Sequence, residues 1–240
     1  MSDNHTPDTT GTTTAAGDGW KPKAIVFDLL TALLDSWTLW DASTPSGTAA
    51  EGRPWRARYL ELTFGAGPYA ADGARYEDLV RRAAVEAGLP TSAPAALLRR
   101  WDSLEAWPET ADVLQRLKGD GYRLGVVTNC SRRLGHAAAA RVIVGGDGDK
   151  EGKEGPFDVV VTAEESGYYK PDGRAYGAVL DALGVEARDV LFVAGSAGDV
   201  EGATAAGMRV VWHNRVGLAK KGEAVPLREG RTLDETLLGW

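Results

Sequence analysis

Three short apolar runs in this sequence end at polar residues that could take part in chemistry. In chain order, these polar residues are Asp28, Thr128 with Asn129, and Ser196. A carboxylate at a strand end, with a cation such as Lys170 converging on it, stays ionised and can form a covalent ester or acyl phosphate. Asp28 is therefore a candidate nucleophile, and the alternative role for an aspartate at this place is a helix cap or a loop residue.

The elements that must position these residues form an alternating pattern. Apolar runs typical of buried strands stand at residues 24–27, 124–127, 159–161, 190–193 and 210–212. Helical patterns lie between the runs, as at 111–118 and 174–183, each followed by a glycine. This alternation predicts an α/β fold with a parallel sheet covered on both faces. Ligands of such sheets lie beyond the carboxyl ends of the strands, so the polar residues should converge on one crevice.

The segment from residue 34 to 107 interrupts the alternation. Helical stretches lie near 55–64, 76–87 and 93–104, and five of the eight tryptophans fall within the segment. We expect a helical cap, inserted after the first strand and folded over the crevice to exclude water. The composition of residues 145–155 is that of a flexible surface loop. The predicted organisation is a disordered tail at 1–20, a core at 21–33 and 108–240, and a cap at 34–107.

Four motifs resemble those of the haloacid dehalogenase superfamily, in the same order and at the same spacing. They are FDLLTALLD (27–35), VVTNCS (126–131), YYKPDGRAY (168–176) and LFVAGSAGDVEGATAAGM (191–208). The resemblance covers nearly everything from Lys23 to about Arg215. It implies a Rossmann-like parallel sheet with an inserted helical cap, and a hydrolase whose nucleophile is Asp28 of the first motif.

The motifs differ from those of the superfamily's phosphatases at positions that matter for acid and metal chemistry. Phosphatases carry a second aspartate two residues after the nucleophile, where this chain has Leu30, which cannot transfer a proton. They also carry Gly-Asp before the serine of the last motif, where this chain has Ala194 and Gly195. Because Mg²⁺ prefers carboxylate oxygens, these changes disfavour a phosphatase and predict a site without metal.

The remaining features resemble the L-2-haloacid dehalogenase branch, which uses neither metal nor cofactor. Lys170 is followed six residues later by Tyr176, as in that branch. The cap carries a Trp-Arg pair at 55–56, similar to the pair whose arginine receives the departing halide. The strand-end pair at 128–129 matches the branch's Ser-Asn, and WHNR at 212–215 is similar to its WINR.

The resemblance implies a role for each of these residues. Asp28 would attack the carbon that bears the leaving group and form an ester with it. Arg56 and Asn129 would stabilise the departing anion, while Lys170 and Asp199 would help water to hydrolyse the ester. Asp199 is also expected to cap the helix that follows it. The residues expected to bind the substrate are Thr128, Tyr176 and Ser196.

Three substitutions depart from the pattern of that branch. A hydroxyl four residues after the nucleophile becomes Ala32, with Thr31 beside it as a substitute; a serine becomes Ala194; and a pocket tryptophan becomes Gly198. We expect a roomier pocket, and a substrate that is larger or not a halide. Two alternatives stay open: a divergent hydrolase or binding protein for another carboxylated metabolite, and a phosphatase with a rebuilt Mg²⁺ site.

Composition bounds the class of protein and its partners. The chain has 240 residues, of which 43% are hydrophobic and 25% charged, as in ordinary globular proteins. A net charge of -7 with scattered basic residues excludes a basic face for nucleic acid or anionic lipid. A single cysteine, Cys130, and the absence of an apolar run of about 20 residues favour a cytoplasmic protein. The expected partner is a small carboxylated molecule, and a homodimer is compatible with the resemblance.

Overall fold

The structure is a computed structural model, and it describes residues 19–71, 75–142 and 155–240. The predicted tail lies outside the described residues apart from residues 19 and 20, as does the predicted loop apart from residue 155. Among the described residues, no helix is both long and apolar enough to span a membrane.

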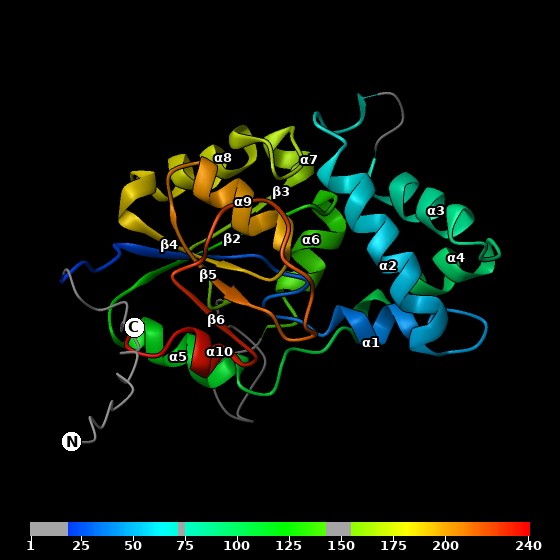
Figure 1. The fold of residues 1–240 in the computed structure, drawn as a ribbon, viewed down its shortest axis with the longest axis horizontal. Coiled ribbons are helices and arrows are strands. Elements are labelled where there is room, and N and C mark those ends of the chain that lie inside the picture. The colour runs from blue at the N-terminus through cyan, green and yellow to red at the C-terminus, as the bar shows by residue number, and fades with distance from the viewer. Residues whose placement is uncertain (1–18, 72–74, 143–154) are drawn as a thin grey trace, which may run out of the picture.

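A six-stranded parallel sheet forms the centre of the fold, in the order β3-β2-β1-β4-β5-β6 (Figure 1). Its strands are β1 (Ala24–Phe27), β2 (Arg123–Thr128), β3 (Val159–Thr162), β4 (Val190–Ala194), β5 (Arg209–His213) and β6 (Arg228–Gly230). β1 lies between β2 and β4, with Phe27 opposite both Val126 and Val193. The polar residues that follow these three strands therefore meet at one edge of the sheet, as predicted.

Helices cover both faces of this sheet. Alternate residues of β1 point to opposite faces, so Val26 packs with one layer of helices and Phe27 with the other. The first layer is α8 (Gly173–Leu183) and α9 (Ala197–Ala205). The second layer is α5 (Thr110–Gly119), α6 (Arg132–Ala139) and α10 (Leu233–Thr236). The short elements α7 (Ala163–Ser166) and η3 (Ala187–Asp189) lie in the connections. The predicted α/β class is confirmed.

The chain between β1 and α5 folds as a helical insertion beside the carboxyl ends of the strands (Figure 1). An antiparallel bridge between Leu34 and Ala106 joins its two ends. Inside it, aromatic rings pack in series from Trp40 through Tyr59 and Tyr76 to Trp101, with neighbouring centroids 4.9 to 5.9 Å apart. Its helices are α1 (Ser36–Asp41), α2 (Ala49–Phe64), α3 (Tyr76–Glu86), α4 (Ser92–Arg99) and η2 (Trp101–Ser103).

Two local features differ from the expectations. β6 was not predicted, because its sequence Arg-Glu-Gly has no apolar residue to mark a buried strand. The helix α9 begins at Ala197 with Ser196 as its N-cap, so the prediction that Asp199 caps this helix is wrong. Asp199 instead lies in the first turn, where a carboxylate is favoured by the helix dipole.

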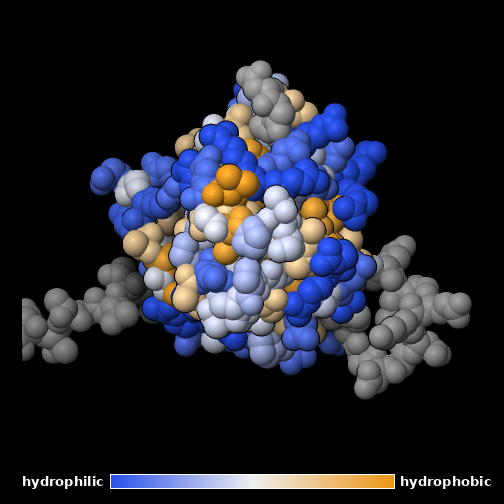
Figure 2. Space-filling model, turned by 90° about the vertical axis from the view of Figure 1, so that its right-hand side faces the viewer, coloured by the Kyte–Doolittle hydropathy of each residue, from blue (hydrophilic) through white to orange (hydrophobic). Residues whose placement is uncertain are grey.

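The face of the cap is a mixture of hydrophilic and hydrophobic residues, with its apolar residues in small separate patches (Figure 2). Val85 of α3 is an exposed apolar residue of the cap, with 66% of its surface accessible. Stable protein interfaces bury about 800 Å² on each partner. Because the small apolar patches do not mark out such an interface, the homodimer stays a prediction.

Candidate active site

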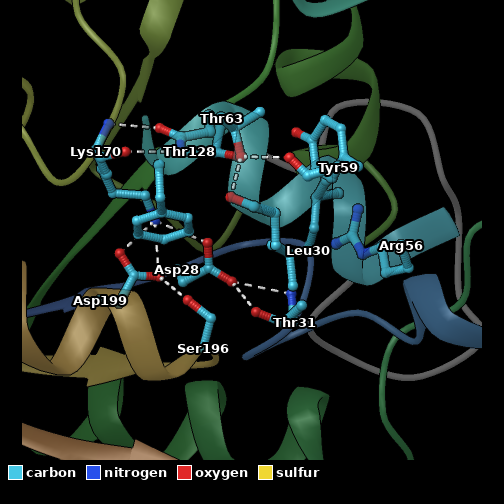
Figure 3. Close-up of a pocket in the computed structure, with 13 residues that line it drawn as sticks. Asp28, Leu30, Thr31, Arg56, Tyr59, Thr63, Thr128, Lys170, Ser196 and Asp199 are labelled. Atoms are coloured by element: carbon cyan, nitrogen blue, oxygen red, sulfur yellow. Dashed lines mark hydrogen bonds and ion pairs between the residues drawn. The ribbon is translucent and has the colours of Figure 1, made fainter. Parts of the chain in front are cut away.

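Asp28, Lys170 and Asp199 form a buried charge network at the carboxyl edge of the sheet (Figure 3). The ammonium of Lys170 donates to Oδ1 of Asp28 at 2.8 Å and lies 3.0 Å from Oδ1 of Asp199. Asp28 retains 7% of its accessible surface, whereas Lys170 and Asp199 each retain 1%. One cation thus contacts two carboxylates in a place where water is largely excluded.

The second oxygen of Asp28 is held by the loop that follows it. The backbone N–H of Thr31 donates to Oδ2 at 2.9 Å, its hydroxyl donates at 2.6 Å, and the N–H of Ala32 donates at 3.3 Å. Thr31 therefore supplies the hydroxyl that is absent at Ala32, as the sequence suggested. Both oxygens are fixed, so the carboxylate presents a defined direction to the cavity.

The two carboxylates differ in acidity. Burial acts to raise the pKa of Asp28, but the charge of Lys170 and the bonds from Lys170 and Thr31 outweigh it, and the net pKa is lowered. Burial raises the pKa of Asp199; Lys170 opposes that shift, while the charge of Asp28 adds to it. Burial acts to lower the pKa of Lys170, but the two carboxylates raise it overall. Asp28 is thus the more acidic carboxylate of the pair, and Asp199 is the better proton acceptor.

Asn129 positions Lys170 by binding its peptide group. Its Nδ2 donates to the carbonyl of Lys170 at 3.1 Å, and its Oδ1 accepts from the N–H of Lys170 at 2.7 Å. Thr128, the last residue of β2, lies beside Asn129 in the wall of the cavity, and its hydroxyl donates to the sulfur of Cys130 at 3.3 Å. The side chain of Asn129 therefore orients the lysine while lining the cavity.

Tyr176 and Ser196 both donate to Asp199. The hydroxyl of Tyr176 donates to Oδ1 at 3.0 Å, and the hydroxyl of Ser196 donates to Oδ2 at 3.1 Å. Ser196 lines the cavity beside Asp28, whereas Tyr176 is outside its described lining and packs on Phe192. The expectation that Tyr176 contacts the substrate therefore has no support in this geometry, because its hydroxyl is turned towards Asp199.

Arg56 of α2 reaches the cavity from the cap and is 1% exposed. Its guanidinium lies over the rings of Trp37, Trp40 and Tyr59, with 4.7 to 5.7 Å to the centroids. Its Nη2 donates to Ser36 at 3.0 Å, and Ser36 donates in turn to the carbonyl of Leu30. Within the described residues, its Nε and Nη1 have no hydrogen-bond partner. A buried cation with free N–H groups is suited to bind an anion.

The cavity that joins these groups is small, at about 20 Å³, which is room for about one water molecule. The pocket predicted to be roomier than that of the resembling branch stays a prediction. A side-chain carbon at Gly198 would lie 2.7 Å from the ring of Phe64, so this ring from the cap occupies the space that the glycine leaves. Leu30 contributes to the same wall.

Several residues of the site were not predicted from the sequence. Ser36, Tyr59 and Phe64 come from the cap, where no motif marked them. Cys130, by contrast, is fully buried, and burial raises the pKa of its thiol to about 12. A thiol of that pKa stays protonated at neutral pH and cannot act as a nucleophile.

The carboxylates of this site do not fit a Mg²⁺ ion. Among the described residues there is no group of three or more His, Cys, Asp or Glu side chains that could hold a metal. The ammonium of Lys170 lies between Asp28 and Asp199. A side-chain carbon at Gly195 would lie 2.3 Å from the backbone nitrogen of Ala32, so a further carboxylate cannot be added there without moving the backbone.

Comparisons with known proteins agree with the motifs. Residues 22–207 match the family model of haloacid dehalogenase-like hydrolases. An (S)-2-haloacid dehalogenase of Pseudomonas putida is 30% identical over 222 residues, which cover 89% of this chain and 95% of that protein. A phosphatase of Mycobacterium tuberculosis is 34% identical over 123 residues, or 49% of this chain and 51% of that protein. The crystal structure of an L-2-haloacid dehalogenase superposes with a TM-score of 0.72 at 26% identity, covering 88% of this chain and 95% of that one.

Proposed function

The chain belongs to the haloacid dehalogenase-like hydrolases, and from that premise we propose that it hydrolyses the carbon–halogen bond of 2-haloacids through an ester on Asp28, without a metal. The observation that carries this proposal is the pairing of two groups in one cavity. Asp28 has a lowered pKa, and Arg56 offers two buried N–H groups that have no partner among the described residues. A displacement that releases an anion requires this pair of functions.

In the first step a carboxylate oxygen of Asp28 attacks C2 of the substrate. The O–C2 bond forms as the carbon–halogen bond breaks, and the halide leaves with the bonding electrons towards Arg56. Asp28 needs no general base because its pKa is already lowered. The aromatic rings around Arg56 keep water away from the guanidinium, which strengthens its attraction for the anion.

In the second step water attacks the carboxyl carbon of the Asp28 ester. Asp199 accepts the proton of this water, as its raised pKa favours, and Lys170 stabilises the charge on the carbonyl oxygen. Cleavage of the ester releases a 2-hydroxy acid and restores the carboxylate of Asp28. Tyr176 acts on this step indirectly, because its hydroxyl holds Asp199 in position.

The carboxylate of the substrate would bind beside Thr128 and Ser196. Both residues line the cavity, and Ser196 is the N-cap of α9, whose first backbone N–H groups attract an anion. Asn129 lines the same cavity, in addition to orienting Lys170.

A second candidate function is the binding or turnover of another carboxylated metabolite. It is favoured by Ala32, Ala194 and Gly198, which remove groups that the resembling branch carries. The partial match to a phosphatase keeps a third reading open. Leu30 at the position of the proton donor and the lysine between the carboxylates argue against that reading.

The decisive experiment is halide release from racemic 2-chloropropionate in the presence of EDTA. We expect release by the parent protein and a loss of about 10⁴-fold or more in the Asp28→Asn variant. Asp112→Asn, on the exposed side of α5, is the matched control and should retain activity. Single turnover in ¹⁸O water should place label in the peptide that contains Asp28.

The outcomes separate the three readings. Halide release that Asp28→Asn leaves intact would contradict the ester mechanism. No release from any 2-haloacid would favour the metabolite-binding reading, and phosphate release that needs added Mg²⁺ would favour the phosphatase.

A further inference from the structure

A second cavity lies beside the one at Asp28 and shares a wall with it. It measures about 270 Å³, close to the lower limit of about 300 Å³ for small-molecule pockets. The three residues that line both cavities are Leu60, Phe64 and Ser196. The cavity at Asp28 thus adjoins a much larger space.

One side of the second cavity is a face of α2. Ala57, Leu60 and Phe64 line it at the three- and four-residue spacing that places side chains on one side of a helix. The opposite side consists of Gly198 at the start of α9 and Leu218 in the segment after β5. Ala57 adds little bulk to this face, so space remains between the cap and the core beside the ring of Phe64.

Phe64 is the aromatic residue of the wall that the two cavities share. It is the last residue of α2, it is only half-buried, and its ring contacts the main chain at Gly198. The cavity at Asp28 has room for about one water molecule, which is less than any 2-haloacid requires. A substrate must therefore displace side chains that line this cavity before it can reach Asp28, and Phe64 is one of them.

We propose that the second cavity binds the hydrocarbon chain of longer 2-haloacids, and that the ring of Phe64 is the gate that joins it to the site at Asp28. This inference rests on the proposed function. With C2 at Asp28 and the leaving group at Arg56, the chain from C3 passes Leu60 and Phe64 into the larger space.

An uncharged chain fits this space better than a second carboxylate. Its side chains are mainly apolar, among them Trp37 and Leu218. The two charged residues in its described lining, Glu61 and Lys221, are of opposite sign and exposed. Each methylene buried in such a site raises affinity about fourfold.

The test compares two non-reactive acids, propionate and hexanoate, by titration calorimetry. The parent protein should bind hexanoate roughly 50-fold more tightly, because three additional methylene groups are buried. Leu218→Trp, which fills the second cavity from the segment after β5, should reduce this preference at least tenfold. Val225→Trp is the matched control: Val225 is 76% exposed and outside the described lining, so the preference should be unchanged.

A second measurement tests the gate. Phe64→Ala should raise the association rate of hexanoate severalfold, while the association rate of propionate should rise less. Equal binding of the two acids, no binding of either, or an unchanged preference in Leu218→Trp would each overturn the inference.

Failure of this inference can be told from failure of the proposed function. Halide release from 2-bromopropionate without any preference for chain length would leave the proposed function standing and remove the second cavity from it. A chain-length preference in binding, without halide release from any 2-haloacid, would remove the proposed function. It would leave the second cavity as a binding site for a hydrocarbon chain.

Discussion

The core and the cap each contribute a buried cation to the cavity, and the two cations differ in their partners. Lys170, from the core, is paired with the carboxylates of Asp28 and Asp199. Arg56, from the cap, has aromatic rings and one hydroxyl as neighbours, and among the described residues two of its nitrogens have no acceptor. The donors of the core network are therefore paired without a ligand, whereas the cap site has donors left for an anion.

Because the two cations differ in their partners, their substitutions should differ in their effects on the stability of the fold and on ligand binding. Removal of one partner from a complete buried charge network leaves an uncompensated charge, which destabilises the fold. An incompletely hydrogen-bonded cation lowers the stability of the free protein and is compensated when the anion arrives. Substitution of Lys170 should thus lower the free energy of unfolding in addition to its effect on ester hydrolysis, whereas substitution of Arg56 should act mainly on anion binding.

The largest expected effect is that of Lys170→Met, which leaves two buried carboxylates without a cation. The free energy of unfolding should fall by about 3–5 kcal/mol, as measured by urea denaturation. Burial then raises the pKa of both carboxylates above their unfolded values. The variant should accordingly lose further stability as pH rises from 5.5 to 8, since these groups are stabilising only when protonated.

Lys221→Met, at an exposed position, is the control for that experiment and should unfold as the parent does. Equal stability of Lys170→Met and the parent at pH 8 would show that the charge network does not stabilise the fold.

The next effect is that of Arg56→Met on anion binding. Bromide should change the tryptophan fluorescence of the parent in a saturable way, because Trp37 and Trp40 contact the guanidinium. The variant should lose this response, and its kcat for halide release should fall by about 10²–10³-fold. Arg58→Met, at a neighbouring position that pairs with Glu86 on the surface, should behave as the parent. Unchanged bromide affinity in Arg56→Met would refute the assignment of the anion site.

The smallest effect is that of Thr31→Val, which removes one donor from Asp28 while keeping the shape of the side chain. Loss of the 2.6 Å bond raises the pKa of Asp28, so the acid limb of the pH profile of kcat/KM should move to higher pH. The expected cost in stability is about 1–3 kcal/mol at neutral pH. It should shrink as pH falls through the folded pKa of Asp28, because a lowered pKa stabilises only the ionised form. Thr31→Ser should leave the acid limb in place, and a shift in both variants would argue against a role for the hydroxyl.

The core was predictable because most of its strands are marked in the sequence by a run of apolar residues. Val26 and its neighbours form an unbroken apolar run, and the structure has β1 at the predicted residues. β6 had no such signal, since Arg228 and Glu229 read as a surface loop and enter the sheet only by pairing with β5.

The site residues that follow strands could be predicted from the sequence. The contacts between the cap and the core could not. Asp28 and Asn129 could be read from the strands that precede them. The contact of Phe64 with Gly198 depends on how closely two distant segments approach, which no local pattern records. For the same reason the substitution at Gly198 suggested a larger pocket, whereas the structure fills that space from the cap.

The bridge between Leu34 and Ala106 has a consequence for how this protein could diversify. Because the chain leaves the core and returns to it at neighbouring points, the segment between them can be exchanged without breaking the order of the sheet. The nucleophile and its lysine belong to the part that would be retained, and the arginine and the gate to the part that would be replaced. A lineage could thus inherit its reaction from one ancestor and its choice of substrate from another.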